Sequence, residues 1–541
     1  MTVAKTLFPV KAFPGLKSVS NPSPAELRRR AAFEERTTSF RAPAYYTRRA
    51  SSRSAQNTFL LEGETKAGRH QAAMAPEFAR RVAEWVAQAM PKVEWYRIDR
   101  VIGRHPSASF HARLWLPQEY ARVALLWSQT LFAPSQAQKN LSREPDVLTV
   151  YLPQWKELIP EAARSGLPER LVLLCPDRGV NYVLGIDYVG EAKMSFLRLA
   201  MFGMKRRGGL GLHAGSKLIR AASGAELRDV GMLLFGLSGT GKTTLTLDDH
   251  GLKKPEGVLT LQDDIVFLTR DGAAYGSEDN FYVKTEGLAR EEQPDLYAAL
   301  TNENSVFENV HVDEAGAVDF LNYANGTNGR ALCRRNLLPN ASDQIDLGRV
   351  DKVVFITRRD TVVPPVARLS RDQAAAYFML GESIETSAGD PSKAGQSIRQ
   401  VGFNPFIVGL EEDEGNRFWE ILRDNPGIEV YLLNTGSIGK GADNGGAGAA
   451  GVKITKAVSS AILVFIARQG KLEPGAWMAD AEWGYETPAR VPGIDDFARK
   501  YSPRSYYRAP TYRRLVQDLK QERQAYLSQF TRLRPEASRA L

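Results

Sequence analysis

The sequence predicts a mixed α/β protein whose C-terminal part contains a mononucleotide-binding domain. The segment GMLLFGLSGTGKTTLTL, residues 231–247, is typical of a buried strand that breaks into a glycine-rich turn and restarts as a helix. Further apolar stretches downstream are typical of buried strands, with turns and shorter helices between them. These stretches are 257–268, 350–358, 428–434 and 457–467.

The turn matches the pattern G-x-x-x-x-G-K-[ST] of nucleotide-binding phosphate loops. Its glycines let successive backbone N–H groups point toward phosphate oxygens, and the following helix adds its positive N-terminal end. Lys242 is expected to reach the β- and γ-phosphates, and the Thr243 hydroxyl to ligate a divalent ion. The flanking strand and helix favour this interpretation over a flexible linker. The predicted phosphate-binding residues are Gly236, Leu237, Ser238, Gly239, Thr240, Gly241, Lys242, Thr243 and Thr244.

Length and composition indicate a globular protein of more than one domain. A chain of 541 residues exceeds what one hydrophobic core usually supports, and 43% of the residues are hydrophobic. The stretch 457–467 ends at Arg468, too short to span a bilayer, so we expect a core strand there. The N-terminus has no continuous apolar segment of a secretion signal. Two cysteines, Cys175 and Cys333, indicate a reducing, cytoplasmic location.

Three parts are expected along the chain. Residues 1–55 are rich in Pro, Ser and Arg and are expected to be loosely ordered, apart from a short helix near 24–36. Residues 56–215 are expected to form an N-terminal, substrate-side domain. Residues 216–541 are expected to form the nucleotide-binding domain, and within it 439–451 has the glycine-rich composition of a mobile loop.

The net charge of +9 raises the possibility of a nucleic-acid partner. Much of the basic excess lies in residues 28–54, where Glu34 and Glu35 interrupt it, and no nucleic-acid-binding motif accompanies it. We therefore expect a solvated basic surface or attraction for an anionic small-molecule substrate, with no nucleic acid and no membrane partner. A monomer is the default expectation.

An acidic pair and a histidine are the other candidate site residues. Asp263 and Asp264 follow an apolar strand downstream of the phosphate loop, where an acid would hold magnesium against the phosphates. A single histidine near a strand end, such as His213, is more often structural than a ligand. An arginine pair such as Arg334 and Arg335 is commonly surface charge. By themselves these signals indicate a phosphotransferase or an ATPase.

Taken together, the segments resemble the ATP-dependent phosphoenolpyruvate carboxykinases in order and spacing over roughly residues 95–500. The matching blocks are YVLGIDYVGEAKMSFLRLAMFGM, GLSGTGKTTL, LTLQDDIVFL, SEDNFYVKTEGL, CRRNLLPN and the region VVFITRRDTVVPPVARLSRDQAAAYFMLG. The resemblance implies a two-lobed carboxykinase-like α/β fold with a P-loop C-terminal domain. It implies ATP with magnesium, and manganese, as cofactors. The implied reaction decarboxylates oxaloacetate and phosphorylates the resulting enolate.

The resemblance also implies roles for single residues. It makes His213 and Asp264 ligands of a divalent metal beside Thr243. It places near the nucleotide base, with a looser match, Lys453 and Ser459. The residues that it implies at oxaloacetate or at the transferred phosphoryl group are Lys242, Arg335, Tyr188, Lys193, Lys284 and Arg53.

Two positions depart from the family pattern. Where the family has a pair of lysines, this chain has Lys193 and Met194, and a thioether is a poor ligand for manganese or magnesium. The segment SSRSAQNT, residues 51–58, replaces the family's TGRSPKD. Intact phosphate-binding residues with altered metal and carboxylate residues would also suit a kinase of the same fold with another acceptor. A catalytically weak regulatory protein is a third possibility, which the retained Lys242 and Thr243 disfavour.

Overall fold

The chain forms two compact units in a computed structural model. Unit 1 consists of Met1–Gly203, Ser277–Pro339 and Phe406–Leu410, and unit 2 consists of the remaining segments, Met204–Gly276, Asn340–Pro405 and Glu411–Leu541. The segment 277–339, which we assigned to the nucleotide-binding part, therefore belongs to unit 1, because the chain returns to that unit after leaving it. The described residues are 15–50, 55–135, 144–161, 164, 166–224, 226–326, 328–385, 395–444, 451–469 and 476–541.

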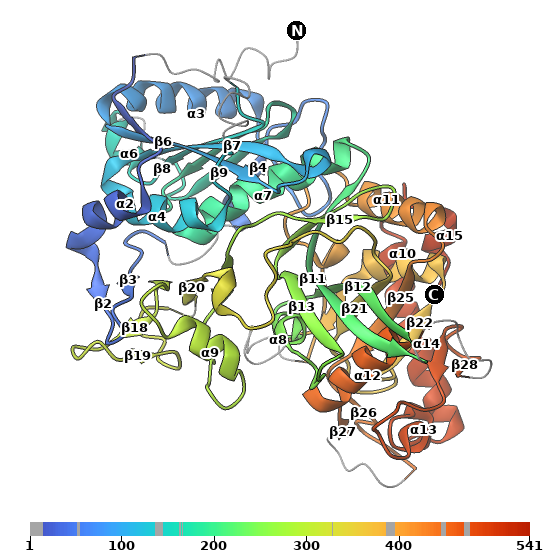
Figure 1. The fold of residues 1–541 in the computed structure, drawn as a ribbon. Helices are drawn as coiled ribbons and strands as arrows, with labels where there is room; N and C mark the ends of the chain where they lie inside the picture. The colour runs from blue at the N-terminus through green and yellow to red at the C-terminus, as the bar shows by residue number, and fades with distance from the viewer. Residues whose placement is uncertain are drawn as a thin grey trace. The chain divides into compact units, whose positions relative to one another are not determined.

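Unit 1 is built on an eight-stranded sheet in the order β1-β6-β7-β8-β10-β9-β4-β5. Helix α3 (Pro76–Ala89) lies on one face of this sheet and helix α7 (Val189–Arg206) on the other (Figure 1). Strand β10 shows the alternation that this requires: Tyr182 joins the apolar core under α3, whereas the Asn181 amide donates to the carbonyl oxygen of Ser195 in α7 at 2.7 Å. The strands are β1 (Ser18–Ser20), β4 (Thr58–Leu60), β5 (Ala72–Ala73), β6 (Trp95–Ile102), β7 (Phe110–Pro117), β8 (Val147–Leu152), β9 (Leu171–Cys175) and β10 (Val180–Leu184).

The basic N-terminal segment contains regular structure. Helix α2 (Pro24–Ala31) begins at the cap residue Ser23 and buries Leu27 and Ala31. A second sheet of unit 1, in the order β16-β20-β17-β3-β2, includes two strands from this segment. Residues 15–50 are thus more ordered than we expected from their Pro, Ser and Arg content, because apolar side chains such as Leu27, Ala42 and Tyr45 are buried. The strands are β2 (Arg36–Thr37), β3 (Pro43–Tyr45), β16 (Phe281–Lys284), β17 (Val306–Glu308) and β20 (Arg330–Cys333).

Unit 2 contains a ten-stranded mixed sheet in the order β15-β14-β11-β12-β21-β25-β22-β29-β28, with β13 paired to β11. Strands β12, β21 and β25 run parallel to one another, as in doubly wound nucleotide-binding folds. The strands are β11 (Leu210–Ser223), β12 (Glu226–Gly236), β13 (Gly257–Gln262), β14 (Ile265–Leu268), β15 (Ala274–Gly276), β21 (Lys352–Thr357), β22 (Val366–Leu369), β25 (Glu429–Asn434), β28 (Trp477–Ala479) and β29 (Glu486–Pro488).

One predicted strand was wrong. The apolar stretch 457–467 forms helix α12 (Lys456–Arg468), whose N-cap residue Thr455 accepts a hydrogen bond from the Val458 amide. Buried side chains occur on most sides of this helix, including Ile462 and Leu463. A helix that is apolar nearly all round lacks the polar face that marks amphipathic helices, so its periodicity cannot be told from that of a buried strand.

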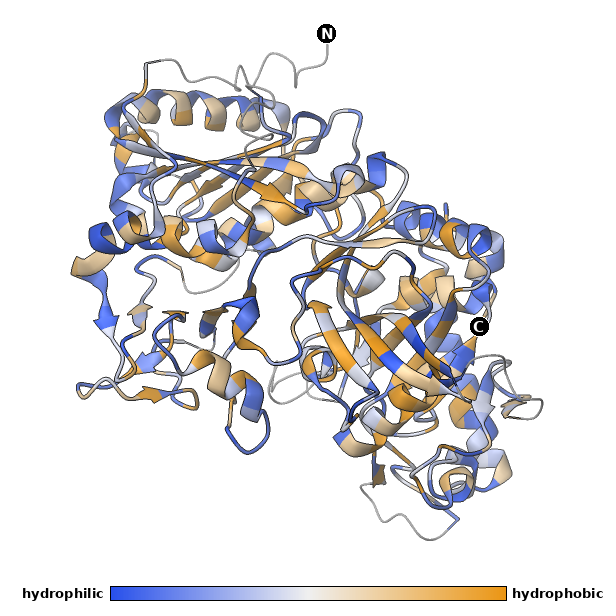
Figure 2. Cartoon of the chain, in the orientation of Figure 1, coloured by the Kyte–Doolittle hydropathy of each residue, from blue (hydrophilic) through white to orange (hydrophobic). Residues whose placement is uncertain are grey.

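Apolar residues concentrate in the strands of both units, whereas many helices alternate apolar and polar residues (Figure 2). Within the ranges given above, no helix is both long and apolar enough to cross a membrane.

The C-terminal helix α14 (Ala509–Leu527) is tied to unit 2 by a buried arginine. The Arg523 guanidinium, which is fully buried, donates to Glu382 at 3.0 Å and to the Tyr377 hydroxyl at 2.9 Å. Arg359 also donates to the Glu382 carboxylate at 2.8 Å. These cations, against the opposing effect of burial, hold the pKa of Glu382 far below its usual range, so this carboxylate stays ionised inside the protein.

Replacing Arg523 by methionine should destabilise unit 2. Removing one partner of a buried ion pair leaves a poorly compensated charge, so we expect the free energy of unfolding to fall by about 3 kcal/mol. Urea denaturation of wild type and variant measures the loss. Arg513→Met is the control on the same helix, since the Arg513 side chain is 68% exposed and should matter little. Equal destabilisation by both variants would contradict this account of Arg523.

Candidate active site

The segment 236–247 forms a strand, a turn and a helix. Strand β12 ends at Gly236, and helix α8 (Lys242–Leu247) begins after Gly241, which has a φ of +94° that disfavours other residues. The turn is closed by Thr240, whose hydroxyl donates to the carbonyl oxygen of Leu237 at 2.8 Å. A Cβ atom at Gly236 would lie 2.4 Å from the Thr240 hydroxyl oxygen. The turn therefore requires glycine at two of the motif positions.

This turn lies at the carboxyl ends of the three parallel strands. Thr435, which follows β25, donates its hydroxyl to the carbonyl oxygen of Thr240 at 2.8 Å. Its backbone N–H donates to the carbonyl oxygen of Thr357, the last residue of β21, at 2.9 Å. Ligands of parallel α/β sheets bind outside the carboxyl ends of the strands, so the turn has the position that a phosphate loop requires.

The predicted acidic strand 257–268 is two strands, β13 and β14, with Asp263 and Asp264 between them. Both strands pair with β11, and the break in pairing brings Asp264 to His213 of β11. The His213 Nε2 atom lies 3.0 Å from Asp264 Oδ1, and Lys242 Nζ lies 3.8 Å from the same oxygen. The Thr243 hydroxyl donates to Asp263 Oδ2 at 3.3 Å. The structure thus brings together the phosphate-loop residues and the candidate metal ligands.

The hydrogen bond of His213 Nδ1 indicates the protonation state of its Nε2 atom. Its Nδ1 atom lies 2.8 Å from the carbonyl oxygen of Phe403, which can only accept, so Nδ1 carries the proton. Burial, and next the charge of Lys242, lower the pKa of His213, which favours the neutral ring. The Nε2 lone pair then faces the Asp264 carboxylate. Two electron-pair donors at this separation suit a cation bound between them.

The donor set fits a divalent metal that is bound together with phosphate. Carboxylate and hydroxyl oxygens suit magnesium and manganese, whereas an imidazole nitrogen is a ligand of transition metals. Within the part of the chain that the structure describes, no group of three or more His, Cys, Asp or Glu side chains could hold a metal. Phosphate oxygens and water would therefore have to complete the coordination shell.

The two residues expected near the nucleotide base have different surroundings. Lys453 is exposed in the short strand β27 (Val452–Lys453). Ser459 is 2% exposed in α12, where its backbone N–H donates to the carbonyl oxygen of Thr455 at 3.0 Å. Residues 445–450 of the predicted mobile loop, and Arg53, lie outside the described residues.

Unit 1 gathers three predicted site residues, Tyr188, Lys193 and Lys284, together with Arg330 around strands β16 and β20. Lys284 and Arg330 are directly opposite each other in this antiparallel pair, so their side chains share one face. Arg330 Nε donates to the Tyr188 hydroxyl at 3.1 Å. Lys193 Nζ lies 5.8 Å from the centre of the Tyr282 ring. We call Tyr188, Lys193, Lys284 and Arg330 the cation cluster.

Lys193 has a fixed partner within unit 1. Its ammonium lies 2.8 Å from Glu278 Oε1, and both side chains are at most 3% exposed. The neighbouring Met194 is 4% exposed in the same helix. The buried ion pair holds Lys193 in its place within the cluster. The Met194 side chain carries no charge.

Arg330 is a candidate functional residue that the sequence analysis did not single out. Its Nη1 atom is buried and makes no hydrogen bond to any described residue. A buried guanidinium nitrogen without an acceptor is costly unless an anion binds there. Arg330 is identified by its position opposite Lys284 in the strand pair, and this position is known only when β16 and β20 are seen side by side.

Arg335, which we expected at the substrate, is engaged by the backbone. Its guanidinium donates to the carbonyl oxygens of Asp279 at 2.8 Å and Glu278 at 3.1 Å, and it stacks 4.6 Å from the Phe281 ring. These contacts hold together the turn before β16. The geometry favours Arg330 over Arg335 as the arginine that faces an anionic ligand.

Comparison with known proteins agrees with this arrangement. A family model described as phosphoenolpyruvate carboxykinase matches residues 17–497. The chain belongs to the phosphoenolpyruvate carboxykinase family. The resemblance seen in the sequence and the mixed α/β fold class are thereby confirmed.

Three curated relatives named phosphoenolpyruvate carboxykinase (ATP) illustrate the similarity. The protein from Aeropyrum pernix is 35% identical over 443 residues, which cover 81% of this chain and 81% of the relative. Those from Sinorhizobium fredii and a Methylobacterium species are 26% and 27% identical and cover 81% and 78% of this chain. The matched parts are 76% and 74% of those two relatives.

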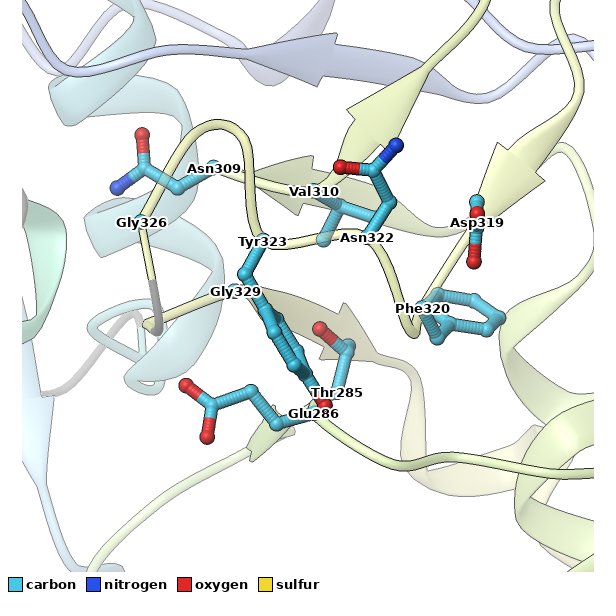
Figure 3. Close-up of a pocket in the computed structure, with 10 residues that line it drawn as sticks. All are labelled: Thr285, Glu286, Asn309, Val310, Asp319, Phe320, Asn322, Tyr323, Gly326 and Gly329. Carbon is cyan, nitrogen blue, oxygen red and sulfur yellow. The ribbon is translucent and has the colours of Figure 1, made fainter. Parts of the chain in front are cut away.

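A small cavity of unit 1 is lined by residues outside the cation cluster (Figure 3). The cavity measures about 10 Å³, which is space for about one water molecule. It touches the cluster through Glu286, whose carboxylate lies 2.6 Å from Lys284 Nζ. We therefore interpret the cavity as a hydration site of this carboxykinase-family fold. It is lined by Thr285, Glu286, Asn309, Val310, Asp319, Phe320, Asn322, Tyr323, Gly326 and Gly329.

Tyr188 is held in place by buried acidic side chains on both sides of its backbone. Asp187, which is fully buried, accepts hydrogen bonds from the backbone N–H groups of residues 48–50 and from Arg122 at 2.5 Å. Glu308, also fully buried, accepts from the Val189 N–H at 3.0 Å and from the Tyr282 hydroxyl. The backbone around Tyr188 is thus fixed by carboxylates that come from separate elements.

Glu308 should make stability depend on pH. Burial raises the pKa of Glu308 to about 7, so the folded state retains a proton that the unfolded state loses at lower pH. Stability gained from this proton is present at pH 4 and is lost as the pH rises to about 7. We expect the unfolding free energy of wild type, relative to Glu308→Gln, to decrease between pH 5 and pH 8. Denaturant titrations at several pH values measure the difference, with Glu169→Gln, whose side chain is 84% exposed, as the control.

Adding a methyl group at Gly236 should weaken nucleotide binding. In Gly236→Ala the new Cβ atom meets the Thr240 hydroxyl, so the turn must open and its N–H groups lose their common direction. Calorimetry with ATP and magnesium should show affinity lower by about tenfold or more. Gly257→Ala is the matched control, because a Cβ atom there has no neighbour within 4 Å. Wild-type affinity in Gly236→Ala would contradict the assignment of this turn to phosphate.

Proposed function

We propose that the protein is an ATP-dependent phosphoenolpyruvate carboxykinase. It would convert oxaloacetate and ATP into phosphoenolpyruvate, carbon dioxide and ADP. The observation that carries the proposal is the combination of family membership with a glycine-dependent turn beside His213, Asp264, Lys242 and Thr243. That the enzyme acts as a monomer and without nucleic acid stays a prediction.

The residues of the turn and of α8 are proposed to bind the nucleotide. The backbone N–H groups of 237–243 would cradle the phosphates. The Lys242 ammonium is 9% exposed and would balance the charge of the γ-phosphate as it transfers. Lys453 and Ser459 are proposed near the base only on the family resemblance.

A divalent metal is proposed to bind at His213, Asp264 and Thr243. When bound, it would supply Lewis-acid stabilisation of negative charge on phosphate and enolate oxygens. The Phe403 carbonyl keeps the His213 ring in the tautomer that presents Nε2. Met194 contributes no ligand of this kind, so the identity of the metal, magnesium or manganese, depends on the other ligands.

The cation cluster is proposed to bind oxaloacetate. Arg330 and Lys284 would pair with the carboxylates of oxaloacetate, and the Tyr188 hydroxyl would orient the bound acid. Lys193 would add positive charge from its fixed place beside Glu278. Arg53 is proposed as a further substrate arginine on the family resemblance alone.

The chemistry has two steps that balance in charge. Cleavage of the bond to the departing carboxylate releases carbon dioxide and leaves its electron pair in the enolate of pyruvate. The enolate oxygen then attacks the γ-phosphorus of ATP, and the bond to the β-phosphate oxygen breaks to release ADP. Positioning and charge neutralisation account for most of the catalysis of such a transfer.

Phosphorus NMR tests the reaction directly. Purified protein with ATP, magnesium and manganese should form phosphoenolpyruvate only when oxaloacetate is present. Consumption of ATP without phosphoenolpyruvate, in the presence of other acceptors, would indicate a kinase of the same fold. Absence of product despite calorimetric ATP binding would overturn the carboxykinase proposal.

The two arginines near β20 should behave differently. Arg330→Gln removes the guanidinium that faces the proposed substrate, so we expect turnover to fall by about a hundredfold or more. Arg335→Gln removes backbone contacts and should lower the melting temperature with a smaller effect on turnover. Rates of phosphoenolpyruvate formation and thermal melts of both variants make the comparison. A larger loss of turnover in Arg335→Gln would restore Arg335 as the substrate arginine.

A further inference from the structure

Strand β11 carries a lysine that contacts the far end of the phosphate-loop helix. Lys217 is fully buried, and its Nζ atom donates to the carbonyl oxygens of Leu245 at 2.7 Å and Asp248 at 3.0 Å. Its third contact is His250 Nε2 at 2.8 Å. An ammonium group has three protons, so these three acceptors use all of them.

The contacts at Leu245 and Asp248 lie where helix α8 ends. The last carbonyl groups of a helix have no partner within it, and a cation there satisfies them and complements the helix dipole. Helix α8 has six residues, so its carboxyl end is about one turn from Lys242 and Thr243. A shift of this end would therefore be transmitted to the residues that face the nucleotide phosphates.

The same face of β11 meets the carboxyl-terminal half of α8 at two positions. Residues 213, 215 and 217 alternate with the others and so share one face of the strand. A Cβ atom at Gly215 would lie 2.3 Å from the hydroxyl oxygen of Thr246, which shows how closely the helix approaches the strand. The Thr246 hydroxyl also donates to the carbonyl oxygen of Lys242 at 2.8 Å. Lys217 and Gly215, which both meet the helix, thus lie on the strand face that also carries the candidate metal ligand His213.

A chain of hydrogen bonds holds the partners of Lys217. Because His250 Nε2 accepts from Lys217, the proton of this ring is on Nδ1, which lies 3.0 Å from Asp248 Oδ2 and 2.9 Å from Ser460 Oγ. Burial lowers the pKa of His250 to about 4, which keeps the ring neutral. Ser460 of helix α12 donates to Asp248 at 2.7 Å, and Lys456 lies 2.7 Å from the other Asp248 oxygen.

The backbone conformation at His250 directs its ring toward Lys217. His250 has a φ of +57°, a left-handed conformation that is uncommon for residues other than glycine. The surrounding hydrogen bonds maintain this conformation and direct the ring toward Lys217.

We propose that Lys217 is a positioning residue for the nucleotide phosphates. From β11 it caps the carboxyl end of α8, and through His250, Asp248 and Ser460 it locks this helix to α12. The proposal rests on the proposed function only in that α8 follows the phosphate loop. It assigns Lys217 no contact with ATP.

The test compares nucleotide affinities of Lys217→Met and wild type by calorimetry with magnesium. Burial lowers the pKa of Lys217 to about 7, so measurements at pH 6 keep the wild-type ammonium charged. We expect ATP affinity to fall by about tenfold and AMP affinity to change by less than about twofold, because AMP lacks the phosphates that α8 faces. Amide hydrogen exchange in 236–248 should be faster in the variant.

Arg220→Met is the matched control. Arg220 is on the same strand, and it pairs with Asp229 at 2.7 Å on the exposed side, so its loss should leave both affinities unchanged. Ser460→Ala removes the far end of the hydrogen-bond chain and should weaken ATP binding by about threefold. If Lys217→Met does not fold, the ATP affinities of Ser460→Ala and His250→Asn test the proposal instead. Asparagine is chosen at position 250 because it tolerates the left-handed backbone there.

Wild-type ATP affinity in a folded Lys217→Met protein, or in both of the other variants, would overturn the proposal. A parallel loss of ATP and AMP affinity would also overturn it, since that result indicates a general structural role. None of these measurements requires oxaloacetate. Failure to form phosphoenolpyruvate would therefore count against the proposed reaction and leave the role of Lys217 to be judged on the affinities.

Discussion

The close packing of strand β11 against helix α8 is the constraint on which the organisation of unit 2 depends. Gly215 permits the approach, because any side chain there would collide with Thr246. With the helix this close, one strand face presents His213 toward Asp264 and Lys217 toward the helix end. The candidate metal ligands, the glycine-rich turn and Lys217 are consequently parts of one packed layer, in which a displacement of one part disturbs its neighbours.

Unit 1 uses buried charge where unit 2 uses close packing. Arg122 contacts Asp187 at 2.5 Å and lies 3.6 Å from Glu308, and all three side chains are fully buried. Buried ion pairs of this kind contribute little net stability, since desolvation offsets much of their attraction. We attribute to them the orientation of Tyr188, which lies between Asp187 and Val189 in the sequence and bonds to Arg330. Two carboxylates from separate elements leave the chain few alternative conformations around it.

Local sequence signals were sufficient to predict a structural element wherever residues close together in the sequence form it. The strand, turn and helix at 231–247 follow from glycines and apolar residues within a few positions, and the structure has all three. The helix at 457–467 was misassigned because its polar face is missing, and the environment that buries it is distant in sequence. The order of 15–50 was underestimated for the same reason, since strand β3 is stabilised by pairing with β17. Composition describes a segment and carries no information on the partners that cover it.

The sequence by itself determined the family, the α/β class and the strand, turn and helix at 231–247, because these depend on short motifs in a fixed order. Only the tertiary structure separated Arg330 from Arg335: the two are five positions apart, but Arg330 lies opposite Lys284 in the strand pair, whereas the Arg335 guanidinium donates to backbone carbonyl oxygens. It also decided that 277–339 returns to unit 1 and that Lys217 meets the end of α8. Pairing between strands and contacts between distant segments are set by packing, whose free energy depends on the whole chain.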